Sequence, residues 1–193
     1  MKKIDDFKPQ SNFAPSLLLH SCCAPCSSSV IERLTKLFKI TVFFYNPNIY
    51  PKSEYEKRMR EQANFLSRLK SSEPIGFIEE AYDSNEFYNA VKGWENEKEG
   101  GKRCFICYKL RMEKTAKLAE TKGFDYFTTT LSVSPYKNAK TLNEIGCKLE
   151  YKYKAQYLYS DFKKNNGYLR SIELSKEYGL YRQNYCGCAY SKR

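Results

Sequence analysis

Two kinds of hydrophobic pattern alternate along the chain. Short apolar runs rich in β-branched and aromatic residues, each followed by polar or turn-forming residues, predict strands. Between them, apolar residues recur at three- and four-residue spacing, which is typical of helices that bury one face. The predicted strands are residues 16–20, 40–45, 75–78, 124–129 and 156–159. The predicted helices are residues 26–38, 51–69, 84–91, 104–122, 139–150 and 168–178.

Strands that alternate with amphipathic helices predict an α/β fold built from βαβ units. In this class a mostly parallel sheet carries helices on both faces. Ligands bind beyond the carboxyl ends of the strands. The first predicted strand leads directly to Cys22 and Cys23, and the helix that begins at Cys104 precedes the fourth strand. We therefore expect the cysteines to meet at this rim of the sheet.

The length of 193 residues suits one domain with a substantial core. We expect a single α/β domain over residues 1–193, in which residues 137–193 form a basic, tyrosine-rich part that closes over the cysteine site. The formal net charge is +11, and residues 137–193 carry +7 of it, with 12 Lys+Arg against 5 Asp+Glu. This excess favours a polyanionic partner, because lysine and arginine release counterions from phosphates. A basic surface that only maintains solubility explains the charge equally well.

The N-terminal residues do not follow the pattern of a secretory signal, and no apolar run approaches the ~20 residues that span a bilayer. We therefore expect a cytoplasmic protein with no membrane partner. Its eight cysteines would stay reduced there, so clustered cysteines indicate metal binding or redox chemistry. The single histidine, His20, excludes sites built from several histidines.

Seven of the eight cysteines fall into three groups with short internal spacing. The groups are Cys22-Cys23-x-x-Cys26, Cys104-x-x-Cys107 and Cys186-x-Cys188. A C-x-x-C pair at the start of a helix places both sulfurs on one face, where one metal ion or cluster can bind both. Seven thiols exceed the four of one zinc site, and an iron–sulfur cluster would leave three for a second metal or a dithiol, although spacing does not distinguish zinc from iron. The eighth, Cys147, lies in an apolar helical pattern and is expected to pack in the core.

Four motifs occur in order across residues 17–191. They are H-S-C-C-A-P-C (20–26), R-C-F-I-C-Y-x-x-R-M (103–112), T-T-T-L-S-V-S-P-Y-K-N (128–138) and Y-R-Q-N-Y-C-G-C (181–188). Together they resemble the QueH-type epoxyqueuosine reductases. The resemblance implies a Rossmann-like fold related to the adenine-nucleotide-hydrolase superfamily. It also implies an oxidoreductase that converts epoxyqueuosine to queuosine at the wobble position of tRNA, with iron–sulfur chemistry in place of cobalamin.

The resemblance further implies roles for the seven grouped cysteines, all of which are candidate metal ligands. The positions that would hold a [4Fe–4S] cluster are matched by Cys22, Cys23, Cys104 and Cys107. The C-x-C of Cys186 and Cys188 is implied either as a redox-active pair or as part of a second, mononuclear iron site next to the cluster. Some relatives carry aspartate in place of Cys26, and because thiolate and carboxylate both bind iron, a metal-ligand role fits both. Cys26, Cys186 and Cys188 are therefore the candidate catalytic cysteines.

Reduction of an epoxide to an alkene takes two electrons and two protons and releases water, so an external low-potential electron donor is required. Tyr136, Asp161 and His20 are the candidate proton donors. His20 is also a candidate metal ligand, or a residue that orients one. A histidine that merely packs at the end of a strand fits equally well.

The basic, tyrosine-rich C-terminal part suits the anticodon stem-loop of a tRNA that carries epoxyqueuosine. A flipped-out base can stack on tyrosine while lysine and arginine contact the phosphates. The cations predicted to bind the nucleic acid are Lys137, Lys140, Lys163, Lys164, Arg170 and Arg182. Two other functions stay open at this point: a zinc-stabilised RNA-binding module without catalysis, and a cytosolic thiol–disulfide oxidoreductase.

Overall fold

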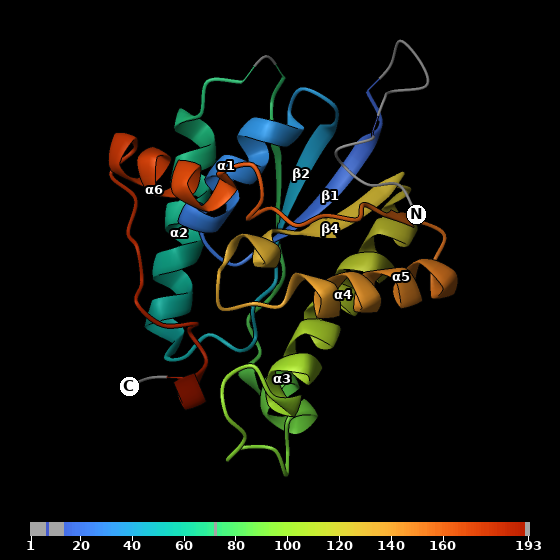
Figure 1. Ribbon diagram of the computed structural model, residues 1–193, viewed down its shortest axis with the longest axis vertical. Helices are drawn as coiled ribbons and strands as arrows, with labels where there is room; N and C mark the ends of the chain where they lie inside the picture. Colours follow the sequence, from blue (N-terminus) through green and yellow to red (C-terminus); the bar gives the residue numbers. More distant parts are fainter. Residues whose placement is uncertain (1–6, 8–13, 72, 192–193) are drawn as a thin grey trace.

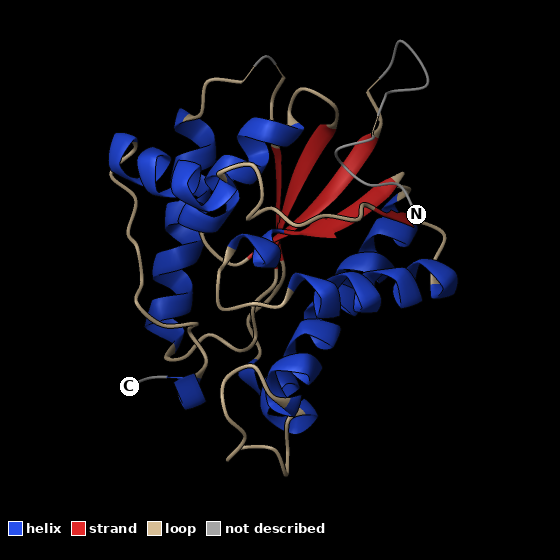
Figure 2. Cartoon of the chain, in the orientation of Figure 1, coloured by secondary structure: helices blue, strands red, loops and turns tan. Residues whose placement is uncertain are grey.

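A computed structural model describes residues 7, 14–71 and 73–191 of the protein. The described residues form one five-stranded sheet in which all neighbouring strands run parallel (Figure 2). The strand order is β3-β2-β1-β4-β5. The strands are β1 (Ser16–Ser21), β2 (Lys39–Phe44), β3 (Gly76–Glu79), β4 (Tyr126–Thr129) and β5 (Gln156–Tyr157).

Helices cover both faces of this sheet (Figure 1). They are α1 (Ala24–Leu34), α2 (Lys52–Arg68), α3 (Ser84–Ala90), α4 (Lys102–Lys122), α5 (Ala139–Lys152) and α6 (Gly167–Glu177). Helices α1, α2 and α6 pack on one face, and α4 and α5 pack on the other. The predicted α/β class is confirmed, whereas its Rossmann-like subtype stays a prediction. Among the described residues, no helix is long and apolar enough to cross a membrane.

Strand β1 is the centre of the sheet and is buried on both faces. Leu17 and Leu19 belong to the core cluster under α1, while Leu18 belongs to the cluster under α4 and α5. This is the two-residue alternation of a strand, with an apolar side chain on each face because helices cover both. Burying each leucine completely contributes on the order of 2 kcal/mol to folding. The strand therefore holds the residues that follow it in a defined place.

The order of the strands reverses beside β1, and this reversal locates the site. The chain passes from β1 to β2 and β3 on one side, and then returns to place β4 and β5 on the other side. The crossover connections therefore leave β1 and β4 in opposite directions. A crevice forms at such a point, beyond the carboxyl ends of the two strands. The segment after β1 carries the first cysteine group, and the segment after β4 carries residues 130–137.

Most predicted elements differ from the structure by one or more residues at an end, and the predicted strand 156–159 is reduced to Gln156–Tyr157. For two other elements the physical reason is clear. The helix predicted over 26–38 begins at Ala24, with Pro25 in its first turn, where the missing N–H of proline is not needed. It ends at Leu34, because the next residues turn the chain so that Lys39 N–H can donate to the carbonyl of Pro15 and start β2. Phe38 is still buried, but from the turn and not from a helix.

The strand predicted over 124–129 starts two residues later, at Tyr126. Gly123 ends α4 in the left-handed conformation, with φ of 72°. The N–H of Phe124 then donates to the carbonyl of Ala119 at 2.9 Å. This pair of features forms a helix C-cap, which glycine favours because it has no Cβ. Phe124 therefore belongs to the cap of the helix and not to the sheet.

Candidate active site

The first cysteine group lies at the point where β1 passes into α1. Cys22 follows the strand, Cys23 is the N-cap residue of α1, and Cys26 is in its first turn. The three sulfur atoms lie within 4.8 Å of one another. In the described part of the chain, no other three histidine, cysteine or acidic side chains come this close. The group therefore has the spacing of a metal site.

Hydrogen bonding divides the charge unequally among these three sulfurs. The sulfur atoms of Cys22 and Cys23 are 3.8 Å apart. Hydrogen bonds with Cys23 and Cys26 hold the pKa of Cys22 well below its usual value. The bond with Cys22 is the main cause that raises the pKa of Cys23 to about 12 and the pKa of Cys26 above its usual value. This hydrogen bonding favours the thiolate form at Cys22 over the thiolate form at its two neighbours.

The second cysteine group lies in the first two turns of α4. Cys104 accepts a hydrogen bond from the N–H of Gly100 at 3.2 Å and packs against the cluster that contains Cys22 and Cys23. Cys107 is buried in a neighbouring cluster together with Cys188, and burial raises its pKa to about 12. Like the first group, this pair lies near the N-terminus of a helix.

The third cysteine group lies on the C-terminal loop, which is paired with the segment after β2. Cys188 forms an isolated antiparallel bridge with Ile49, and the N–H of Tyr50 donates to the carbonyl of Gly187 at 2.8 Å. Gly187 has a φ of 100°, and a Cβ there would lie 3.0 Å from both Arg58 and Ile49. Glycine is therefore required between the two cysteines, both for its conformation and for the space.

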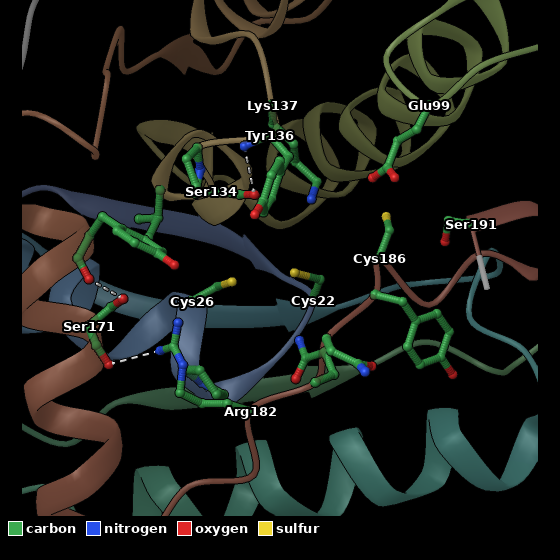
Figure 3. A pocket seen from close by; sticks show the side chains of 17 residues that line it. Cys22, Cys26, Glu99, Ser134, Tyr136, Lys137, Ser171, Arg182, Cys186 and Ser191 are labelled. Carbon is green, nitrogen blue, oxygen red and sulfur yellow. Dashed lines mark hydrogen bonds between the residues drawn. The ribbon is translucent and has the colours of Figure 1, made fainter. Parts of the chain in front are cut away.

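A cavity of about 680 Å³ opens beside the three groups. Figure 3 shows the sulfur atoms of Cys22, Cys26 and Cys186 pointing into it from two segments of the chain. Its opposite wall includes Tyr136 and Lys137, from the segment after β4. The other four grouped cysteines, Cys23, Cys104, Cys107 and Cys188, are not among the residues that line the cavity. Three thiols therefore face a space large enough for a small-molecule ligand.

Two fully buried arginines lie behind the thiols, and sequence reasoning missed both of them. Arg58 donates through Nη1 to the carbonyl of Cys186 at 3.3 Å and pairs through Nε with Glu54 at 2.7 Å. Arg111 donates through Nε to the carbonyl of Cys107 at 3.3 Å. In each guanidinium, Nη2 is buried with no hydrogen-bond partner among the described residues.

The positive charge of Arg111 faces sulfur atoms. No carboxylate of the described residues lies within ion-pair distance of it. Burial alone would lower the pKa of Arg111, but the sulfurs of Cys107, Cys186 and Cys22 raise it above its usual value. The signal in the sequence was its place four residues after Cys107, which puts both side chains on one face of a helix. An arginine in that position lies beside the cysteine.

A family model described as Epoxyqueuosine reductase QueH matches residues 17–193. The chain belongs to this family. It is 48% identical over 181 residues to the Epoxyqueuosine reductase QueH of Streptococcus pyogenes serotype M1, which covers 93% of this chain and 71% of the relative. It is 39% identical over 182 residues to the protein of the same name from Thermotoga maritima, covering 91% of this chain and 90% of the relative. The predicted family is confirmed, and with it the enzyme class, an oxidoreductase.

In this member of the QueH family, His20 is part of the fold and does not face the cavity. Its side chain is fully buried, with Nδ1 2.9 Å from the Thr129 hydroxyl and Nε2 3.1 Å from the carbonyl of Tyr45. Because a carbonyl only accepts, Nε2 carries the proton and Nδ1 accepts from the threonine. Burial lowers the pKa of His20 to about 4. Both ring nitrogens have hydrogen-bond partners within the fold. This arrangement agrees with the alternative in which the histidine only packs at the end of a strand.

The two other predicted proton donors lie in different surroundings. Tyr136 lines the cavity at its mouth and is 80% exposed (Figure 3). Asp161 is outside the cavity lining and forms an ion pair of 3.1 Å with Lys163. The geometry therefore brings the tyrosine, and not the carboxylate, to the cavity of this QueH family member.

The six cations predicted to bind nucleic acid divide into three classes. Lys140 and Lys164 are exposed on the surface. Lys163 and Arg170 are partnered within the fold: the first donates to the carbonyls of Ser132 and Lys137, and the second pairs with Glu32 and Glu173. Lys137 and Arg182 line the cavity, where Arg182 donates to the carbonyl of Ser171 and to the hydroxyl of Ser175.

Proposed function

We propose that this protein reduces epoxyqueuosine to queuosine at the wobble position of tRNA, with an iron–sulfur cluster and without cobalamin. The reaction is named by its relatives in the family. The observation that carries the proposal is that three cysteine groups, which are far apart in the sequence, come together at one crevice of the sheet beside a cavity. Thiolates in this number are the donor set that iron–sulfur clusters use.

The buried arginines provide a test of whether such a cluster fits. Arg58 and Arg111 each bury a positive charge and leave Nη2 without a partner among the described residues. Arg58 has Glu54 as a carboxylate partner, whereas Arg111 has none among the described residues. An unpaired buried cation is costly, so a compensating anion is expected next to Arg111. A cluster held by four thiolates carries negative charge and has sulfur atoms that accept hydrogen bonds. The donor set and the orphaned guanidinium nitrogens therefore both fit an iron–sulfur cluster.

The proposed cluster ligands are Cys22, Cys23, Cys104 and Cys107. When bound, the cluster would supply electrons one at a time from an external low-potential donor. The remaining grouped cysteines, Cys26, Cys186 and Cys188, would hold a second iron or, in the case of the C-x-C, form a redox-active pair. Two of these, Cys26 and Cys186, line the cavity, where the modified base would lie. The cavity volume of about 680 Å³ is in the range of sites that enclose small ligands.

The overall reaction consumes two electrons and two protons. Both carbon–oxygen bonds of the epoxide break, an alkene forms, and the oxygen leaves as water. Tyr136 is placed to deliver a proton at the cavity mouth, since it is the predicted donor that lines the cavity. Asp161 is held by Lys163 and would need to leave that ion pair to take part.

The tRNA anticodon stem-loop is the proposed partner, which places the enzyme in the cytoplasm. Lys140 and Lys164 are exposed and free to meet phosphates, and Tyr136 offers an exposed ring at the cavity mouth on which a base can stack. Residues 137–193 are proposed to close over the cysteine site. Arg182 from this part lines the cavity, as does Cys186.

Purification under anaerobic conditions tests the proposal directly. We expect broad absorbance near ~400 nm with stoichiometric iron and sulfide. With a chemical one-electron reductant and no cobalamin, the protein should convert epoxyqueuosine in tRNA to queuosine, seen by mass spectrometry as the loss of one oxygen atom. Zinc without iron, or reduction that depends on added cobalamin, would contradict the proposal.

A pair of cysteine variants distinguishes a proposed cluster ligand from a cysteine that only packs in the fold. Cys104→Ser removes a proposed ligand and should abolish both the absorbance and the reduction. Cys147→Ser changes a half-buried cysteine outside the three groups and should leave both intact. An active, colourless Cys104→Ser variant would refute the ligand assignment.

A further inference from the structure

Lys137 is placed differently from the other lysines of the basic part. It lines the cavity together with Cys22, Cys26 and Cys186. Figure 3 shows its side chain reaching from the wall opposite the thiols into the space that the three sulfur atoms face. Lys140, three residues further along, is exposed at the start of α5. Two lysines only three positions apart therefore differ in surroundings: Lys137 faces the cavity and Lys140 faces solvent.

The backbone of Lys137 is held in place on both sides. Its N–H donates to the carbonyl of Ser134 at 3.2 Å, and its own carbonyl accepts from Lys163 Nζ at 3.3 Å. The next residue, Asn138, caps α5 by accepting from the N–H of Thr141 at 3.2 Å. The direction of the side chain into the cavity is therefore a consequence of fixed backbone on either side of it.

The charge of Lys137 has no carboxylate partner among the described residues. Burial acts to lower the pKa of its amine, but the sulfurs of Cys186, Cys22 and Cys26 raise it above the usual value. Lysine is ordinarily protonated at neutral pH, so its ammonium group is a cation beside the cavity. This cation faces the space in which the reacting group would lie.

We propose that the Lys137 ammonium binds the epoxide oxygen of the substrate and stabilises the negative charge that develops on it as the carbon–oxygen bonds break. This inference rests on the proposed function. The two electrons come from an external one-electron donor, such as dithionite in the assay, and the two protons come finally from water. The products are the alkene and water, and Lys137 gives a hydrogen bond but no net proton. It therefore acts as a preorganised donor for a developing oxyanion.

Three variants test the proposal. Lys137→Met removes the charge and keeps the length, Lys137→Arg keeps the charge, and Lys140→Met removes the neighbouring exposed charge. For Lys137→Met we expect the single-turnover rate with dithionite at saturating tRNA to fall by about 10²-fold, as for loss of one oxyanion donor. Lys137→Arg should recover most of this loss. Lys140→Met should reduce the salt slope of tRNA binding by about one.

A binding measurement gives a readout that does not depend on turnover. If the ammonium contacts the epoxide oxygen, the wild type should bind tRNA carrying epoxyqueuosine about tenfold more tightly than tRNA carrying queuosine, since a charge-assisted hydrogen bond is lost with the oxygen. Lys137→Met should lose this preference while its iron content, its salt slope and its affinity for queuosine-containing tRNA stay unchanged. Lys140→Met should keep the preference.

Three results would overturn the proposal, and they differ from failure of the proposed function. The first is a Lys137→Met variant with a wild-type rate and a reduced salt slope, which would make Lys137 a phosphate contact. The second is an unchanged preference for the epoxide in that variant. The third is loss of iron from Lys137→Met, which would assign the charge to holding the cofactor. An iron-loaded wild type that reduces no epoxyqueuosine would refute the proposed function and this inference together.

Discussion

The thiol site behind β1 and the basic C-terminal part both contain many cations, but they use them in opposite ways. Behind the thiols, Arg58 and Arg111 are each 1% exposed. The charge of Arg111 is stabilised chiefly by sulfur atoms, and that of Arg58 by sulfur atoms together with Glu54. In the C-terminal part, Lys140 and Lys164 are exposed, whereas Arg170 is neutralised by two glutamates. A count of positive charge along the chain therefore does not locate a binding surface. The surroundings of each charge decide whether it acts on a ligand, a partner or the fold.

The largest expected effect is the loss of a buried cation. Arg111→Met leaves the thiolates that it faces uncompensated, so we expect the free energy of unfolding of the iron-loaded protein to fall by about 3 kcal/mol. Urea denaturation of anaerobically purified protein measures this, and the iron content should fall with it. Arg170→Met is the matched control on the surface, where loss of a solvent-exposed ion pair should cost less than about 1 kcal/mol. Equal losses of unfolding free energy in the two variants would show that the buried and the exposed arginine contribute alike to stability.

The second effect concerns the tyrosine at the mouth of the cavity. Tyr136→Phe keeps the ring and removes the hydroxyl proton, so we expect the single-turnover rate to fall by about 10²-fold with unchanged tRNA affinity. Tyr151, which is 93% exposed and does not line the cavity, provides the control through Tyr151→Phe. Rapid-quench kinetics and a tRNA binding titration measure the two quantities. A full rate in Tyr136→Phe would show that the proton comes from another donor.

A third effect tests the glycine between Cys186 and Cys188. Gly187→Ala forces a Cβ to within 3.0 Å of Arg58 and Ile49 at a φ of 100°, and we expect a loss of about 2 kcal/mol in the free energy of unfolding. Gly179→Ala has a φ of 62° but open space around it, so only the backbone cost of about 1 kcal/mol should appear. The difference between the two measures the packing of the C-x-C loop on Arg58. Identical losses would mean that this contact is not tight.

The smallest effect compares two adjacent lysines. Lys164→Met removes an exposed charge and should lower the salt slope of tRNA binding by about one, with stability unchanged. Lys163→Met removes hydrogen bonds to Ser132 and Lys137 and should cost about 1 kcal/mol of stability, with the salt slope unchanged. Salt titrations of binding and urea denaturation separate the two results. A lower salt slope of tRNA binding in Lys163→Met would show that this lysine contacts the tRNA.

Much of the fold was predictable because its signals are local. The alternation of Leu17, Leu18 and Leu19 between two core clusters follows from the two-residue period of a strand. The errors were local as well. Gly123 and Phe124 form a cap whose hydrogen bonds compete with the strand, and hydrophobicity alone does not distinguish a buried cap residue from a strand residue.

The candidate site was predictable only in part, for a related reason. The C-x-x-C spacing within a helical turn indicates a shared ligand without knowledge of the fold. The placement of Cys104 next to the cluster of Cys22 and Cys23 depends on the order of the strands. Arg111 was missed because an arginine inside a helix reads as a solvated side chain until its neighbours are known.

The sequence by itself determined the elements, the faces that they bury and the grouping of the cysteines, because these patterns arise between residues a few positions apart. The tertiary structure decided which charges act outward and which act inward. Arg170 meets Glu32 across 138 positions of the chain, and His20 meets Thr129 across 109. No local pattern encodes such pairs, since the energy of a charge depends on its burial and its partners, and both are set only when the sheet and its covering helices assemble.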